Sequence, residues 1–251
     1  VRVVDNIGIN SDIGVISVPA GVVFNGNGFT IFVNLNSSLN GLFSLSGGTI
    51  RNFVLALSGE SNFSSILLQD NSYGTVTSCK ISGGTASLGF GETRDTQDVG
   101  GAIMQNISVP QTLTLSRIEV SSTFNNMLNY AAGLIGSIHA GHVIIDRCLS
   151  SISGDMDRLS GFICTVGSSV TITKSICICT TPRGTFAFGK NDAFNTFYPT
   201  AAGPTATATV EECYCITFSN GNDNNNTQFF SNFYSSPNIT VRDCYIYSNV
   251  S

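Results

Sequence analysis

A five-residue pattern recurs along nearly the whole chain and restricts the folds that the chain can adopt. In most copies a threonine precedes an apolar residue, two polar residues follow, and a cysteine, serine or apolar residue ends the pattern. Eight copies occur, and threonine holds the first position in seven of them. The apolar residues at the second position, which we call the anchors, are Ile31, Ile50, Val76, Leu115, Ile145, Ile172, Val210 and Val241. Internal repetition of this kind indicates a repeat architecture.

The distance between neighbouring anchors varies, whereas the pattern itself changes little. Ile31 and Ile50 are 19 residues apart, but Val76 and Leu115 are 39 residues apart. Constant strands joined by loops of different length are typical of an irregular parallel β-helix, while leucine-rich repeats and propellers hold their period more tightly. The spacing therefore favours a β-helix.

Alternation within each copy assigns the faces of its strand, because successive side chains point to opposite sides. The anchors form an inward column. The residues three positions after the anchors, four of which are cysteine, return to the interior beyond a polar corner. The threonines before the anchors then form an outward column. Its members, which are our candidate binding residues, are Thr49, Thr75, Thr114, Thr171, Thr209 and Thr240.

Another short apolar strand lies upstream of most copies and would complete each coil. These segments are Gly41-Leu42-Phe43, Ser65-Ile66-Leu67-Leu68, Gly101-Ala102-Ile103-Met104, Gly133-Leu134-Ile135-Gly136 and Gly161-Phe162-Ile163-Cys164, with Phe186-Ala187-Phe188 and Phe229-Phe230 as expected later members. One coil cannot bury its apolar column alone, so neighbouring coils must stack. We therefore predict an all-β fold, a single right-handed parallel β-helix (solenoid) of about eight or more irregular coils.

We expect one domain over residues 1–251, since all-β solenoids of this length often do not divide. It would comprise N-terminal coils at 1–40 and repeated coils at 41–247, with loop insertions at 83–100 and 180–207. Because the chain starts at Val1 and ends soon after an apparent strand, we expect it to be part of a larger chain or assembly. An open last coil exposes a strand edge, so neighbouring subunits or copies of the chain are its expected partners.

Composition excludes several classes of function. Charged residues make up 11% of the chain and its formal net charge is −5. The eleven Lys and Arg residues are scattered singly, so the surface lacks the basic patch that nucleic acid or an anionic membrane attracts. We therefore expect no nucleic-acid partner and, without a long apolar run, no membrane insertion.

The segment from Val18 to Ile31, which reads VPAGVVFNGNGFTI, resembles the first coil of pectin-lyase-like β-helix proteins. The segment from Gly133 to Ser150 and, more loosely, that from Gly161 to Cys177 resemble the GLUG-type repeats of secreted and surface proteins. Both resemblances imply a parallel β-helix. They say little about activity, because this architecture hosts lyases, hydrolases, adhesins, spikes and ice binders.

An enzyme of this fold would place charged side chains together on one outward face, where this chain has threonine. The nearest acidic cluster is Glu92, Asp95 and Asp98, and paired carboxylates can act as general acid and base in glycoside cleavage. Their location in a long loop is also explained by solvation alone. A polysaccharide lyase or glycoside hydrolase is therefore our alternative function. Elsewhere, Glu211-Glu212 and Arg242-Asp243 hold equivalent corner positions in successive copies and are expected to form ion pairs along the stack.

The outward threonines also permit ice binding, because a flat and regular hydroxyl array is what β-helical ice-binding proteins display. Arg51, Asp146 and Glu211 interrupt the neighbouring row, however. The high β-propensity of threonine on an exposed strand is a simpler explanation. Ice binding is therefore our second alternative.

The cysteines allow two interpretations. There are eight, at Cys79, Cys148, Cys164, Cys177, Cys179, Cys213, Cys215 and Cys244. An even number suits disulfides in a secreted chain, but most lie at inward strand positions, where buried thiols act as small hydrophobes. His139 and His142 have no carboxylate or cysteine at the spacing of a known metal site. We therefore expect neither a metal nor another cofactor.

Without an assembled catalytic set, the sequence favours a non-enzymatic structural or adhesive module. Such a module, on a cell or virion surface, would scaffold an assembly or bind glycans or a host surface. Its expected location is extracellular.

Overall fold

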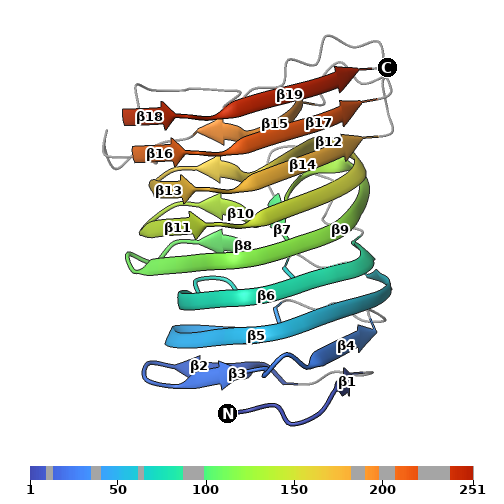
Figure 1. The fold of residues 1–251 in the computed structure, drawn as a ribbon, viewed down its shortest axis with the longest axis vertical. Coiled ribbons are helices and arrows are strands. Elements are labelled where there is room, and N and C mark those ends of the chain that lie inside the picture. Colours follow the sequence, from blue (N-terminus) through green and yellow to red (C-terminus); the bar gives the residue numbers. More distant parts are fainter. Residues whose placement is uncertain are drawn as a thin grey trace.

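The computed structural model of the chain describes residues 1–9, 14–34, 41–61, 65–86, 99–181, 190–197, 207–219 and 238–250. These residues form nineteen β-strands and no helix. Every strand pair among them is parallel. The chain is therefore all-β, and successive repeats stack from β1 at one end to β19 at the other (Figure 1).

The threonine repeats form the first of three sets of stacked strands. This set contains β3 (Val23–Asn25), β11 (His142–Asp146), β13 (Ser169–Thr173), β16 (Thr207–Glu211), β18 (Asn238–Arg242) and stretches of the long strands β5 (Phe43–Ser61), β6 (Tyr73–Ala86) and β9 (Thr112–Ala132). Each member pairs with the next repeat along the chain, so that Thr171 lies beside Thr209 and Thr209 beside Thr240. The repeated sequence pattern is thus also a repeated position in space.

The second set follows the first across a corner in each repeat. It contains β1 (Ile7–Ile9), β4 (Thr30–Asn34), β14 (Ile176–Thr181), β17 (Tyr214–Ser219), β19 (Tyr245–Val250), the later parts of β5, β6 and β9, and the first part of β12 (Leu149–Val166). Direct pairing again joins successive repeats, for example Ile176 to Tyr214 and Tyr214 to Tyr245. Residues at equivalent places in the sequence therefore form columns along the stack.

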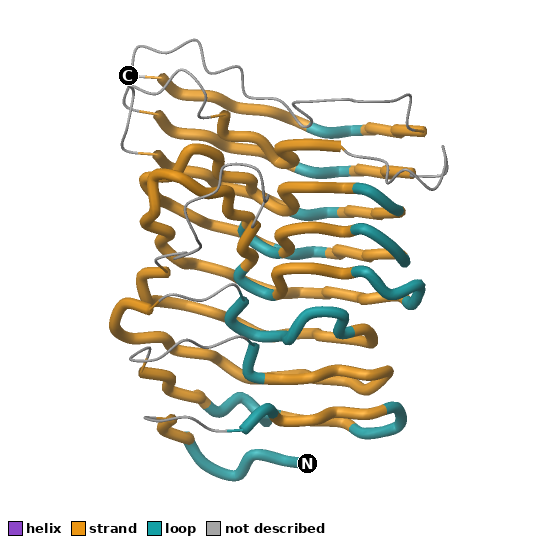
Figure 2. Tube along the Cα trace, turned by 180° about the vertical axis from the view of Figure 1, so that it is seen from behind, coloured by secondary structure: helices purple, strands orange, loops and turns teal. Residues whose placement is uncertain are grey.

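The third set consists of the short apolar strands upstream of the repeats (Figure 2). It contains β2 (Ile16–Pro19), β7 (Val99–Gly101), β8 (Met104–Ile107), β10 (Ile135–Ile138), β15 (Lys190–Phe197), the start of β5 and the end of β12. Ile135 pairs with Met104 on one side and with Ile163 on the other, so these upstream strands stack.

Part of the third set differs from the sequence prediction. Strand β15 lies within 180–207, which the sequence analysis assigned to a loop insertion, and it pairs Phe194 with Ile163 and Phe197 with Val166. Likewise, 83–86 belongs to β6 rather than to the other insertion. The expected members at 186–188 and 229–230 lie outside the described residues. A segment whose length varies between repeats can thus contain a strand that pairs with its neighbour. The phenylalanines in β15 are not adjacent, unlike the large apolar residues of the earlier upstream segments.

The corner between the first two sets is formed by one residue with a positive φ in each repeat. These residues are Asn27, Asn52, Ser78, Arg117, Arg147, Lys174, Glu212 and Asp243, with φ between 52° and 57°. Left-handed backbone costs an L-residue roughly 1–2 kcal/mol, and asparagine and aspartate tolerate it best. Arginine, lysine and glutamate nevertheless occupy four of these positions. The corner therefore carries long charged side chains where glycine would be easier to accommodate.

The anchors fill the interior beneath this corner. Ile50, Val76, Leu115, Ile145, Ile172 and Val210 are each 0% exposed. The register places Ile145 directly between Leu115 and Ile172, which confirms the inward column predicted from the repeats. Fully burying such side chains contributes about 1.5–3 kcal/mol each, so the column is a main source of stability.

The prediction that Ile31 is the first anchor of this column is wrong. Ile31 is buried, but it pairs with Ile7 and Leu55 in the second set. Phe24 takes the anchor position and pairs with Ile50. The cause is the turn at Asn27 and Gly28, both with positive φ, which places Thr30 after the corner instead of before it.

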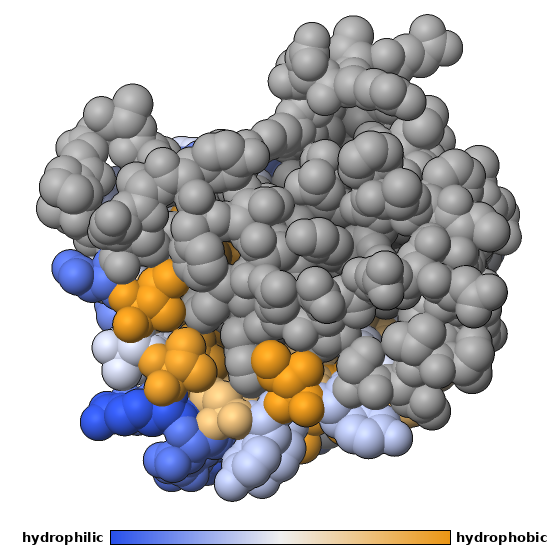
Figure 3. Space-filling view, turned by 90° about the horizontal axis from the view of Figure 1, so that it is seen from above, coloured by the Kyte–Doolittle hydropathy of each residue, from blue (hydrophilic) through white to orange (hydrophobic). Residues whose placement is uncertain are grey.

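Among the described residues, the inward positions of β18 and β19 are more exposed than those of the repeats below. Val241 and Ile246 hold inward positions but are 44% and 43% exposed, whereas Val210 and Cys215 in the repeat below are fully buried. Seen from the end where β18 and β19 lie, hydrophobic and hydrophilic residues lie side by side on the part of the rim that the described residues form (Figure 3).

The face assignment predicts opposite outcomes for two adjacent substitutions. Val210→Lys buries an ammonium group without a partner and is expected to lower the free energy of unfolding by more than about 4 kcal/mol. Thr209→Lys keeps its side chain outward and should change that free energy by about 0.5 kcal/mol or less. Urea denaturation followed by circular dichroism measures both. Equal midpoints for the two variants would contradict the assignment.

Candidate functional site

The candidate binding threonines lie in one outward column of the first strand set. Its members along the stack are Thr49, Thr75, Thr114, Ile144, Thr171, Thr209 and Thr240. The side chains are half-buried except that of Thr240, which is exposed. Ile144 divides the column into two runs of three hydroxyls. The column is thus continuous in register, but its hydroxyl groups are interrupted by an apolar side chain. Its role in ice or glycan binding stays a prediction.

Two ion pairs lie beside this column among the described residues. Glu211 and Arg242, in successive repeats, form the ion pair predicted from the sequence. Asp146 pairs with Arg147 and accepts a 3.0 Å hydrogen bond from Thr173 Oγ1. Partial burial raises the pKa of Asp146, but the bonds from Arg147 and Thr173 outweigh it and leave the pKa below its usual value. These charges are compensated within the surface and offer little to a ligand.

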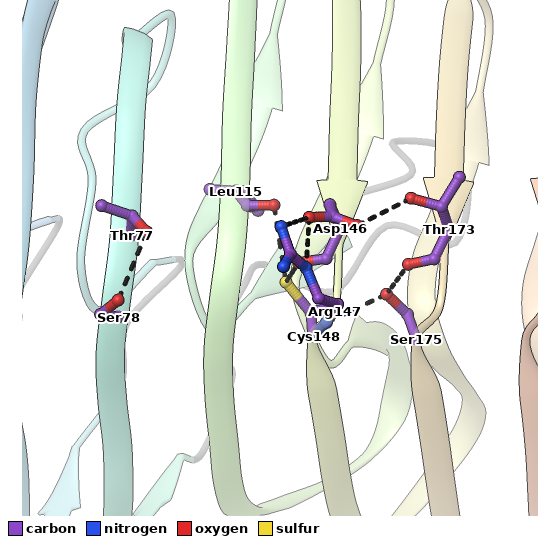
Figure 4. Close-up of polar contacts among 8 residues, drawn as sticks. All are labelled: Thr77, Ser78, Leu115, Asp146, Arg147, Cys148, Thr173 and Ser175. Atoms are coloured by element: carbon purple, nitrogen blue, oxygen red, sulfur yellow. Dashed lines mark hydrogen bonds and ion pairs between the residues drawn. The ribbon is translucent and has the colours of Figure 1, made fainter.

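At five corners the residue that follows satisfies a backbone carbonyl with a thiol or hydroxyl group. Four cysteine Sγ atoms lie 3.1–3.5 Å from the carbonyl oxygen two residues earlier, those of Cys79, Cys148, Cys213 and Cys244. Ser175 Oγ donates to the Thr173 carbonyl at 2.8 Å and accepts from the Cys148 N–H at 3.0 Å (Figure 4). Thiol and hydroxyl groups share this role because both donate hydrogen bonds.

Buried thiols of this kind are poor nucleophiles. Desolvation raises the pKa of Cys79, Cys148 and Cys213 to about 12, so these thiols stay protonated at neutral pH. No disulfide joins Cys79, Cys148, Cys177, Cys213, Cys215 or Cys244 to another described residue. Cys177 and Cys215 are directly paired in register. For these cysteines, the structure agrees with the interpretation as stacked, buried thiols and not with the interpretation as disulfides.

Close packing explains why one buried column needs small residues. A Cβ atom added to Gly161 would lie 2.4 Å from Cys177 Cβ, and one added to Gly133 would lie 1.8 Å from Ser150 Oγ. The third strand set therefore passes against the second with no room for larger side chains. Serine and cysteine fit there, and this constraint is not visible in the sequence.

Two grooves lie along the corner between the first and second strand sets. In both, the left-handed corner residues form one side, and the first outward residues of the second set form the other. The groove nearer the N-terminus has a volume of about 500 Å³, and its polar lining includes Asn27, Asn52, Lys80, Arg117 and Glu119. Lys80 Nζ lies 2.6 Å from Glu119 Oε1. This ion pair occupies the middle of the lining with groups that already satisfy each other.

The groove nearer the C-terminus, which we call the tyrosine groove, has a different lining. Its volume is about 350 Å³, and it is lined by Lys174, Ile176, Glu212, Tyr214, Asp243 and Tyr245. The rings of Tyr214 and Tyr245 stack with centroids 5.2 Å apart and planes 16° apart. Exposed aromatic rings beside charged groups in a groove are the usual composition of a binding site.

A third hollow, of about 230 Å³, is lined mainly by hydroxyl groups. Thr123 Oγ1 and Ser153 Oγ share a 3.1 Å hydrogen bond there. Ser122 Oγ is buried and has no partner among the described residues. Hydroxyl groups of this kind bind water well, and the hollow lacks the aromatic and charged groups of the tyrosine groove.

The proposed catalytic cluster of Glu92, Asp95 and Asp98 lies outside the described residues, so that prediction is not tested. Within the described ranges, no three His, Cys, Asp or Glu side chains gather closely enough to hold a metal ion. His142 Nε2 instead shares a 3.0 Å hydrogen bond with Thr171 Oγ1. Among the same residues, no helix has the length and apolar character needed to cross a membrane.

Sequence reasoning missed the tyrosine groove. The signal was available in the alternation beyond the corner, because the residue after each inward thiol must point outward again. Applied to Cys213 and Cys244, this rule predicts that Tyr214 and Tyr245 face solvent in one column. The left-handed corner residues gave no such signal, since lysine and glutamate rarely adopt that conformation.

Comparisons of the chain with protein-family models, with curated proteins and with solved structures found no match. The pectin-lyase-like and GLUG-type resemblances therefore stay predictions from the segments that carry them. The functional argument depends on the geometry of the corner and its grooves.

The raised thiol pKa values predict how stability depends on pH. The unfolded thiols ionise near their ordinary value of 9.0, whereas the folded ones keep their protons until about pH 12. The folded state therefore binds more protons in this window, and the free energy of unfolding falls as the pH rises through it. Cys148→Ser keeps a donor at the corner, as Ser175 does, and should lose about 1–2 kcal/mol less between pH 8 and 10.5. Urea unfolding at both pH values measures the difference.

Identical pH dependence in the native chain and in Cys148→Ser would show that this thiol is not protected by folding. Ser175→Ala provides a matched comparison, because it removes a corner donor without removing a titrating group.

Proposed function

We propose that the chain is a right-handed parallel β-helix that acts as a rigid, non-enzymatic surface module. On a cell or virion surface it would scaffold an assembly or bind glycans or a host surface. The observation that supports this proposal is the unbroken series of direct pairings between successive repeats, from β3 to β18 in the first set and from β1 to β19 in the second.

Continuous pairing between successive repeats leaves no position at which the stack can bend freely. In a stack of this kind each repeat contacts its neighbours through backbone hydrogen bonds and a shared core, so no repeat moves without disrupting the next. Rigidity and resistance to proteases follow from this continuity. Both properties suit a module that holds a binding surface at a fixed position outside a cell or particle.

The outer surface supports the same proposal. It carries threonine in its most regular column, and the ion pairs of the described residues lie between or within repeats instead of converging on one point. An enzyme requires several charged groups directed at one reacting atom. The alternative, a polysaccharide lyase or glycoside hydrolase, depends on Glu92, Asp95 and Asp98 and is tested together with the main proposal.

The test combines amide hydrogen exchange with a cleavage assay on one preparation of the purified chain. A rigid module predicts protection of the first and second strand sets in every repeat from Ile50 to Val210, and no release of reducing ends from polygalacturonate, alginate or neutral polysaccharides. Rapid exchange in a middle repeat would contradict rigidity. Release of reducing ends that is lost in a Glu92→Gln, Asp95→Asn, Asp98→Asn variant would replace the proposal with the enzymatic alternative.

A further inference from the structure

The tyrosine groove combines an apolar platform with exposed charged groups that form no ion pair among the described residues. Ile176, Tyr214 and Tyr245 form one side and are 38%, 48% and 62% exposed. They belong to one column, because Ile176 pairs with Tyr214 and Tyr214 with Tyr245. Aromatic surface that stays exposed on a folded chain commonly marks an interaction site.

The two rings differ in what they offer a ligand. Tyr214 has Tyr245 stacked on it, so its edge and hydroxyl are the accessible parts. Tyr245 stacks on Tyr214 and is 62% exposed, so part of its ring is accessible from the groove. An aromatic face with partial negative charge attracts the polarised C–H groups on one side of a sugar ring. The groove therefore has a platform for a flat, amphipathic ligand.

The opposite side supplies polar groups at fixed positions. Lys174, Glu212 and Asp243 occupy successive left-handed corners, with φ of 52°, 53° and 52°. All three are exposed, and the described residues contain no ion pair that neutralises them. An ammonium group donates hydrogen bonds and a carboxylate accepts them, so together they can bind both lone pairs and hydrogens of hydroxyl groups.

Strain at these corners has a consequence for binding. Each corner holds its side chain on a backbone conformation that glycine would adopt more easily, and such strain gathers at functional sites. The backbone N–H groups of Lys174 and Glu212 donate to carbonyls of the next repeat, so the backbone of these corners loses little conformational entropy on binding.

We propose that the tyrosine groove is a saccharide-binding site for neutral or amino sugars. Its volume of about 350 Å³ lies at the small end of the range of about 300–1,000 Å³ for ligand pockets, which suits a short oligosaccharide segment. One ammonium and two carboxylates give the lining a net charge of −1, so uronic or sulfated sugars are repelled. The inference rests on the proposed function as a surface module and names the ligand class and location that the module uses.

The test uses five oligosaccharides as probes: chitotriose, lactose and mannotriose as neutral sugars, chitosan dimer as an amino sugar, and trigalacturonate as an acidic sugar. Binding is measured by saturation-transfer NMR and titration calorimetry. We expect at least one neutral or amino probe to bind and trigalacturonate not to bind. Tyr245→Ser should weaken binding by at least about tenfold, and Glu212→Gln with Asp243→Asn should weaken it by a similar factor.

Tyr247→Ser is the matched control. Tyr247 lies two residues further along β19 and is 58% exposed, close to the 62% of Tyr245, but it does not line the groove. This variant should bind as the native chain does. Circular dichroism of each variant confirms that the strands are retained.

The outcomes test the location of the site, the class of ligand and the surface-module function separately. If the native chain binds a probe and Tyr245→Ser binds it equally well, or Tyr247→Ser loses it to the same extent, the assignment to this groove is wrong while the surface-module function stands. If trigalacturonate alone binds, the ligand class is wrong. If none of the five probes binds, the saccharide site is rejected, and hydrogen exchange still decides the surface-module function separately.

Discussion

Parallel hydrogen bonding between successive repeats is the interaction on which the rest of this structure depends. It sets the register in which Ile145 lies between Leu115 and Ile172, and the same register carries the outward threonines and the tyrosines. A slip of one residue would turn every anchor outward, because side chains alternate with a period of two. The buried anchors oppose such a slip in every repeat at once. Stability and surface pattern therefore have a common origin.

The left-handed corner determines which side chains of each repeat project from the surface. Between the two strand sets, one residue projects outward, the next points inward, and the following one projects outward again. Where the inward residue is a cysteine, its thiol donates to the carbonyl two residues earlier. The two outward residues form the sides of a groove. Variation at these two positions changes the lining from the Lys80–Glu119 ion pair to the stacked tyrosines without altering the backbone.

The inward and outward columns could be predicted from the sequence because threonine followed by an apolar residue repeats so regularly. The third strand set was predictable where glycine introduces an apolar run, as at Leu134 and Phe162. Ile31 was misplaced because the extra turn residues at Asn27 and Gly28 shift the corner relative to the pattern. Strand β15 was missed because no earlier copy shares its sequence. The thiol donors and the tyrosine groove depend on the corner conformation, which charged residues such as Lys174 and Glu212 rarely adopt.

A crystal structure of the purified chain, at a resolution that shows side chains, tests the central claim most directly. The account predicts that Thr171 lies between Ile144 and Thr209, with Ile172 and Val210 inward beneath them, and that Lys174 and Glu212 form successive left-handed corners. A density map in which these repeats are antiparallel, or in which Val210 faces solvent, would contradict the account. It would also remove the basis for the tyrosine groove, because Tyr214 and Tyr245 would no longer share a column.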